Sequence, residues 1–192
     1  HVERMNEESA NALLKVMEEP PEGVLFLLTA DSLAGVLPTI RSRCISFAVA
    51  PVSPEDCARY CTAQGVGAKD AALYSALFDG HIGTVLAAAR DEARREQVDR
   101  ALALAKAAAA RDSYAAAVLL AAYEKDKAGA SALLADFRAV AAAGLRDSPH
   151  SPVEGETARK ALGAADVAMQ QIGAQVNPKI VLSVLAAQFR TF

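Results

Sequence analysis

The sequence predicts a mostly α-helical protein that begins with the remnant of an α/β domain. Hydrophobic residues make up 53% of the 192 residues, whereas aromatic residues make up only 5%. Most of the apolar surplus is alanine, which favours closely packed helices over β-sheet. Strand-like apolar runs occur only within residues 1–50, while residues 51–92 and residues 93–192 carry helical patterns. We therefore expect three domains with these boundaries.

The first expected helix is marked at both ends. Asn6 is a suitable N-cap residue, and the two glutamates that follow it favour the positive end of a helix. Pro20 and Pro21 stop the helix, because proline cannot continue it. The apolar residues recur at the spacing of one helix face: Ala10, Leu13, Leu14 and Met17.

Two extended segments are expected to complete the α/β part. Val24–Leu28 is a continuous apolar run, which is typical of a strand covered on both faces. Ile45, Phe47 and Val49 alternate with small residues, which predicts a second strand that ends at Pro51. In α/β sheets ligands bind beyond the carboxyl ends of the strands, so the polar residues after Leu28 are candidates for a site.

Residues 51–92 are expected to form a bundle of three short helices. Ser53-Pro54 is a helix start, with serine at the N-cap and proline at the first helical position. A second helix is expected from about Lys69 to Gly80, and a third from about His81. We interpret His81 as a capping residue rather than as a catalytic base.

Residues 93–192 are expected to form an array of five helices. Asp112, Asp126 and Asn177 each precede a helical pattern as N-cap residues, and a helix is expected from about Glu156 to Ala174. The last helix is more apolar than one packed face requires. Either it is the central helix of the bundle or it is buried between subunits. Its apolar residues are Ile180, Val181, Leu182, Val184, Leu185 and Phe189.

Composition and motifs exclude several classes of function. The net charge of −3 argues against an autonomous nucleic-acid binder. The three cysteines, Cys44, Cys57 and Cys61, have no second pair to complete a zinc site, so we expect them to be reduced structural residues. No apolar run approaches the length of a membrane span, and we expect a cytoplasmic protein. The sequence contains no G-x-x-x-x-G-K-[ST] phosphate loop.

The strings NALLKVMEEPPEGVLFLL and LPTIRSRC resemble the clamp-loader subunits of the AAA+ ATPase family. The resemblance covers about the first quarter of the chain. It implies that the first string follows the Walker B strand, so we expect the chain to be the C-terminal part of a longer protein. It also implies that residues 51–92 are the helical lid domain and residues 93–192 the oligomerisation collar.

The resemblance assigns roles to a few residues. Ser42, Arg43 and Cys44 match the SRC motif, whose arginine reaches the nucleotide of the neighbouring subunit in trans. Thr29 is the candidate for sensor 1, with Asp31 as the alternative. The alternative interpretation of Arg43 is a structural one, in which it forms a surface ion pair with an acidic residue.

Three further positions bear on the expected site. His1 falls about where the second Walker B acid would stand. Arg41 competes with Arg43, and we interpret it as structural or as part of a subunit surface. In ATP-hydrolysing members the turn before the last lid helix holds the sensor 2 arginine, whereas here Gly83 occupies that position. The absence of this arginine favours a member of the family that does not hydrolyse ATP itself.

The expected function is to help load a sliding clamp onto primed DNA as part of a larger polymerase assembly, without a self-contained active site. The expected partners are the gamma/tau and delta subunits of the ring, with the clamp and DNA contacted through the assembled complex and no membrane. No cofactor is expected in this chain, and the neighbouring subunits would bind ATP-Mg. Two alternatives stay open: a gamma/tau ATPase of the same family, and a helical adaptor that only binds proteins.

Overall fold

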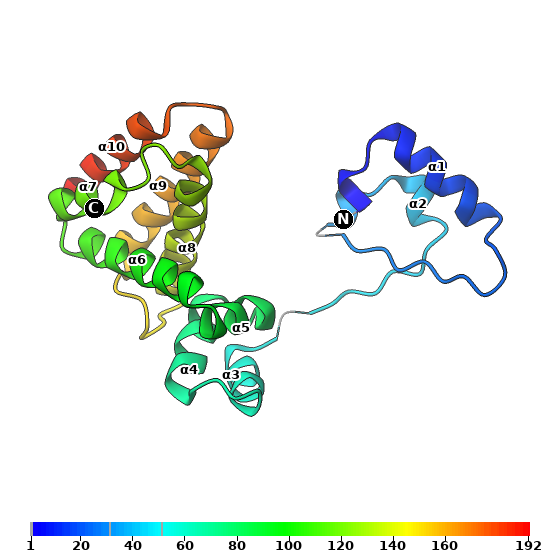
Figure 1. Cartoon of the computed structure of the whole chain (residues 1–192), viewed down its shortest axis with the longest axis horizontal. Coiled ribbons are helices and arrows are strands. Elements are labelled where there is room, and N and C mark those ends of the chain that lie inside the picture. The colour runs from blue at the N-terminus through cyan, green and yellow to red at the C-terminus, as the bar shows by residue number, and fades with distance from the viewer. Residues whose placement is uncertain (1, 31, 51) are drawn as a thin grey trace. The chain divides into compact units, whose positions relative to one another are not determined.

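The computed structural model describes residues 2–30, 32–50 and 52–192 of the chain. The chain divides into two compact units, His1–Ala50 and Pro51–Phe192. Within the described residues all regular secondary structure is helical, which confirms the mostly α-helical fold class (Figure 1). The interpretations that concerned His1, Asp31 and Pro51 lie outside these residues.

The N-terminal unit is built on two helices, α1 (Glu7–Glu18) and α2 (Pro38–Arg41). Helix α1 begins as the sequence predicts, because the Asn6 side chain accepts a hydrogen bond from the backbone N–H of Ser9 at 2.8 Å. Short 3₁₀ turns occupy Val2–Arg4 and Leu33–Gly35. A small apolar core joins the two helices. Its fully enclosed members are Ala10, Val36 and Ile40.

The prediction of two strands is wrong. Val24–Leu28 and Ile45–Val49 are irregular, and no strand is assigned between residues 2 and 50 outside position 31. Their apolar side chains lie largely in solvent; Leu25 and Phe47 are 81% and 84% exposed. A strand forms only by pairing with another one, and within these residues neither segment has such a partner. The expected remnant of an α/β domain is therefore an irregular, helix-containing unit here.

The second unit begins with three short helices, as predicted: α3 (Pro54–Ala63), α4 (Ala68–Leu77) and α5 (Ile82–Arg90). Ser53 caps α3, accepting a hydrogen bond from the N–H of Asp56 at 3.0 Å. His81 stands at the N-cap position of α5, but its side chain makes no capping bond. Its Nδ1 instead lies 2.6 Å from the carbonyl oxygen of Phe78.

The predicted array of five helices follows within residues 92–188, all of which the structure describes. Asp112, Asp126 and Asn177 each accept the expected hydrogen bond at the start of their helix, at 2.9–3.0 Å. The helices are α6 (Glu92–Ala109), α7 (Ser113–Ala121), α8 (Lys127–Leu145), α9 (Gly155–Gly173) and α10 (Pro178–Gln188). The predicted division into three domains stays a prediction; α3–α5 and α6–α10 lie in one compact unit.

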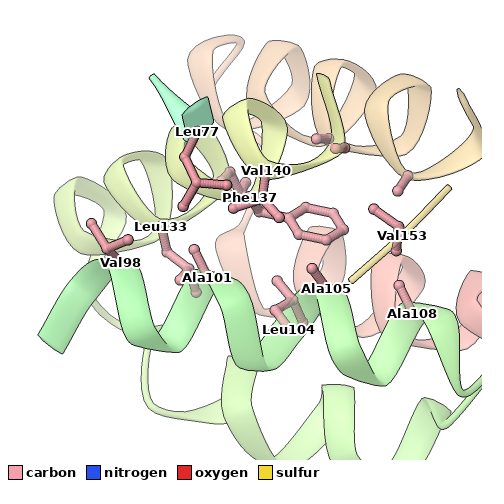
Figure 2. Close-up of a cluster of buried hydrophobic side chains, with 14 of the residues drawn as sticks. Leu77, Val98, Ala101, Leu104, Ala105, Ala108, Leu133, Phe137, Val140 and Val153 are labelled. Carbon is pink, nitrogen blue, oxygen red and sulfur yellow. The ribbon is translucent and has the colours of Figure 1, made fainter. Parts of the chain in front are cut away.

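Helix α8 is the central element of the second unit. It packs against α9, α6 and α4. Figure 2 shows Phe137 pointing from α8 toward the small residues of α6, where Ala101 and Ala105 are fully buried and allow the close approach. By length and composition alone α8 could cross a membrane, but half of that stretch is buried within the protein. Its apolarity is accounted for by its place in the core.

A buried ion pair joins α6 to α8. The guanidinium of Arg94 binds both carboxylate oxygens of Asp136, and the Nη2–Oδ1 distance is 2.6 Å. The side chains are only 22% and 6% exposed. The hydrogen bonds to Asp136 raise the pKa of Arg94 above its usual value. Arg94 also lies over the ring of Phe78, 5.5 Å from its centroid, and so connects α4 to the same pair.

Gly80 closes the turn between α4 and α5 in a way that excludes any side chain. Its φ of +73° is a left-handed conformation that other residues rarely adopt. A Cβ atom there would lie 1.8 Å from the carbonyl oxygen of Val52. Gly83, inside α5, has open space around the corresponding position.

We predict that Gly80→Ala lowers the free energy of unfolding by about 2–4 kcal/mol, because it combines overpacking with left-handed strain. Gly83→Ala should leave stability unchanged or raise it by up to about 1 kcal/mol, since alanine favours a helix. Urea unfolding followed by circular dichroism measures both. Equal effects of the two substitutions would contradict the close approach of Gly80 to Val52.

We also predict that Arg94→Met lowers the free energy of unfolding by about 3–5 kcal/mol, because Asp136 then stays buried without a cation. The double variant Arg94→Met/Asp136→Leu should regain most of the loss, since an apolar pair needs no compensation. The matched control is Arg138→Met. Its ion pair with Asp166 is about half exposed on both sides, and its loss should cost at most about 1 kcal/mol.

Candidate functional site

The candidate site is the turn that ends α2 in the N-terminal unit. Pro38 stands at the first helical position, and the backbone N–H of Ser42 donates to the Pro38 carbonyl at 2.9 Å. Ile40 is 1% exposed and anchors this single turn in the small core. The burial of Ile40 therefore fixes the backbone that carries Arg43.

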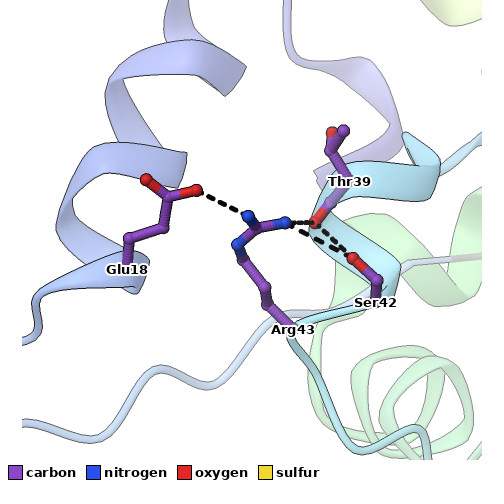
Figure 3. A network of polar contacts seen from close by, with 4 residues as sticks. All are labelled: Glu18, Thr39, Ser42 and Arg43. Carbon is purple, nitrogen blue, oxygen red and sulfur yellow. Dashed lines mark hydrogen bonds and ion pairs between the residues drawn. The ribbon is translucent and has the colours of Figure 1, made fainter.

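Arg43 is held at both ends of its guanidinium (Figure 3). Its Nη2 donates to Oε1 of Glu18 at 2.6 Å, and its Nη1 donates to the carbonyl oxygen of Thr39 at 3.0 Å. Ser42 supports the same arrangement, because its Oγ donates to the Thr39 carbonyl at 3.0 Å and lies 3.4 Å from Nη1. Three of these four residues come from the α2 turn, and Glu18 comes from the end of α1.

The ion pair is accessible to solvent. The side chains of Arg43 and Glu18 are 38% and 52% exposed. A pair of this kind contributes only about 0–1 kcal/mol, because water screens the charges and two long side chains are ordered. Glu18 is the last residue of α1, where the negative end of the helix dipole disfavours a carboxylate. Arg43 is thus a cation held in a defined position, and its pairing with Glu18 is weak and open to solvent.

The other residues of the predicted site lie as follows. Cys44 is half-buried and packs against the core formed around Ile40. Thr29, the sensor 1 candidate, is exposed, and its carbonyl accepts a hydrogen bond from the N–H of Val2 at 2.9 Å. Arg41 is exposed. The structure therefore groups Ser42 and Arg43 around Thr39, and it gives Cys44 a packing role.

Glu18 is the site residue that sequence reasoning missed. No local pattern signals the contact, because Glu18 and Arg43 are 25 positions apart. The sequence offers one weak hint of this contact: an acidic residue ends the first helix, and an arginine follows the next one.

The cysteines and histidines do not form a metal centre in the part of the chain that the structure describes. No group of three or more metal-ligating side chains occurs there. Cys57 and Cys61 are fully buried on α3. Burial, followed by the neighbouring Cys57, raises the pKa of the Cys61 thiol, which disfavours the reactive thiolate. These cysteines are core residues.

A second surface of interest runs along α10. Val181 and Leu185 are buried, yet Ile180 and Val184 on the same helix are 59% and 49% exposed. A shallow groove between α9 and α10 continues this apolar strip past Val167, which is 50% exposed. Helix α10 therefore both packs in the bundle and presents apolar side chains to solvent. Surfaces of this composition are typical of contacts between proteins.

Comparison with known proteins identifies relatives for the N-terminal part of the chain. The sequence profile of the family described as "DNA polymerase III, delta subunit" matches residues 1–53. DNA polymerase III subunit delta' from Haemophilus influenzae is 60% identical over 42 residues, which are 22% of this chain and 13% of the relative. The same subunit from Yersinia pestis is 52% identical over 44 residues, or 23% and 13% of the two chains.

A subunit of another type is also similar to part of the chain. DNA polymerase III subunit gamma from Buchnera aphidicola is 42% identical over 55 residues, which are 29% of this chain and 15% of the relative. The matched segment of the chain thus spans about an eighth of the length of the relatives named first. The similarity includes the α1–α2 unit, since residues 1–53 contain Glu18, Thr39, Ser42 and Arg43.

Proposed function

We propose that the chain comes from a clamp-loader subunit of DNA polymerase III, because residues 1–53 match the family described as "DNA polymerase III, delta subunit" and part of the chain is similar to subunits of the delta' and gamma type. The chain is then part of a delta-prime subunit, which helps load the sliding clamp onto primed DNA. It hydrolyses no ATP of its own. It lends Arg43 to the ATP-Mg site of a neighbouring subunit.

The observation that supports this proposal is the exposed, preoriented guanidinium of Arg43. Guanidinium is planar and always charged, and its parallel N–H groups match the oxygens of a phosphate. Phosphoryl transfer spreads negative charge over the γ-phosphoryl oxygens, and an arginine supplied in trans stabilises that charge. The bonds of Nη1 to the α2 turn preorganise the donor, so little reorientation is needed when a partner's phosphate arrives.

The delta-prime assignment, rather than gamma/tau, rests on the position that Gly83 occupies. Gly83 lies exposed on α5, with open space around it and no cation at that position. Under the clamp-loader interpretation this is where an ATP-hydrolysing subunit carries an arginine directed at its own nucleotide. Its absence supports a subunit that serves its neighbour's site instead. A cytoplasmic location follows from the same proposal.

The C-terminal helices supply the contacts with the gamma/tau and delta subunits in this proposal. The apolar strip of Ile180 and Val184 on α10 supports it, because such side chains gain most from burial against another subunit. Residues 93–192 would then act as a collar, and residues 51–92 as a lid domain.

We predict that Arg43→Ala in the full-length subunit slows ATP hydrolysis by the assembled ring. A trans arginine is worth about 10³–10⁵ in rate at its own site, and other sites in the ring dilute that loss. Arg43→Lys should restore little, because lysine offers a point charge without the fork. The measurement is the ATPase rate per assembled complex, with DNA and clamp present.

The matched control for Arg43 is Arg41→Ala, an exposed arginine two positions away that should leave the rate unchanged. A wild-type rate from a normally assembled Arg43→Ala ring would refute the trans role. Loss of assembly in that variant would instead make Arg43 a structural residue.

We predict that the double variant Ile180→Glu/Val184→Glu weakens binding of the full-length subunit to the ring by about ten-fold or more, since two apolar side chains lose their burial and carboxylates take their place. Its fold should survive, because both positions are exposed. Ser183→Glu, also exposed, is the control for added charge. Unchanged binding, measured by surface plasmon resonance, would move the assembly contacts elsewhere.

A further inference from the structure

Glu18 occupies the edge of Arg43 that a phosphate would need. The contact joins one carboxylate oxygen of Glu18 to Nη2, while Nη1 stays bound to Thr39 and Ser42 of the α2 turn. The two ends of the guanidinium are thus held differently. One end is fixed by neutral groups of its own turn, and the other is neutralised by an anion from another helix.

We propose that Glu18 is an intramolecular stand-in for phosphate, which holds Nη2 of Arg43 until a phosphate oxyanion of the neighbouring subunit displaces it. The proposal rests on the function proposed above and assigns a regulatory role to Glu18 in the same site. No covalent bond changes in this exchange; one oxyanion replaces another on the same cation.

The geometry favours exchange over permanent pairing. Both side chains are substantially exposed, so the pair gains little from being formed. The contact uses a single oxygen, whereas a phosphate carries more charge and can accept two parallel N–H bonds from Nη2 and Nε while Nη1 stays bound to the α2 turn. Phosphate is therefore the stronger partner once it is in reach.

The position of Glu18 also favours the pair within the chain itself. Glu18 ends α1, where its carboxylate meets the negative end of the helix dipole. The cation of Arg43 relieves that repulsion and is kept oriented in return. Core contacts between α1 and α2, through Ala10 and Ile40, hold the two groups at bonding distance.

The first test measures the pair itself in the full-length subunit. An arginine-specific dicarbonyl reagent should modify Arg43 up to about five-fold faster in Glu18→Gln than in the wild type, because the competing carboxylate is gone. Arg41 in the same molecule reports general reactivity and should not change. Glu19→Gln, one residue beyond Glu18 and also exposed, is the control variant. Unchanged reactivity of Arg43 in Glu18→Gln would overturn the proposal.

The second test measures the exchange in the reconstituted ring. Glu18→Gln should hydrolyse ATP up to about five-fold faster than the wild type, and it should have no effect in the Arg43→Ala background, because Glu18 acts only through Arg43. If Glu18→Gln leaves the ATPase rate unchanged or lowers it, while Arg43→Ala slows hydrolysis, the role of Glu18 is overturned and the role of Arg43 stands. A wild-type rate from Arg43→Ala would overturn the proposed function and the exchange together.

Discussion

The Arg94–Asp136 ion pair constrains how the helices of the second unit pack. Asp136 lies on the central helix α8 among fully buried apolar residues, and a carboxylate there is tolerated only when a cation and hydrogen bonds compensate it. Arg94 supplies both from α6, and its contact with Phe78 brings the end of α4 to the same point. The register between α6 and α8 is therefore specified by one polar contact, around which the small alanine side chains allow close packing.

The N-terminal unit depends on a different kind of constraint. Its core is small, so the position of Arg43 relies on the short turn anchored by Ile40 and on two neutral acceptors in that turn. Nη1 of Arg43 is held firmly by this turn, whereas Nη2 is paired only weakly with Glu18. This arrangement suits a residue that acts on a ligand bound by another subunit. A permanently buried pair such as Arg94–Asp136 could not change partners without a large loss of stability.

Sequence reasoning succeeded where the determinants are local. Helix starts at Asn6, Ser53 and Asp126 were predictable because the capping side chain and the backbone it binds lie within three residues. It failed for Val24–Leu28, because a strand depends on a pairing partner that an apolar run does not reveal. The acidic partners of Arg43 and Arg94 lie 25 and 42 positions away, and no periodicity encodes such contacts. The SRC turn was therefore found from sequence, but Glu18 was not.

The most direct test of the account is an electron cryomicroscopy structure of the full-length subunit assembled with gamma/tau, delta, clamp and primed DNA, with a slowly hydrolysed ATP analogue bound. We predict that the Arg43 guanidinium lies within about 3 Å of a γ-phosphate oxygen held by the neighbouring subunit and keeps its bonds to the α2 turn. A ring in which Arg43 faces solvent, or in which the chain takes no place beside a nucleotide site, would contradict it.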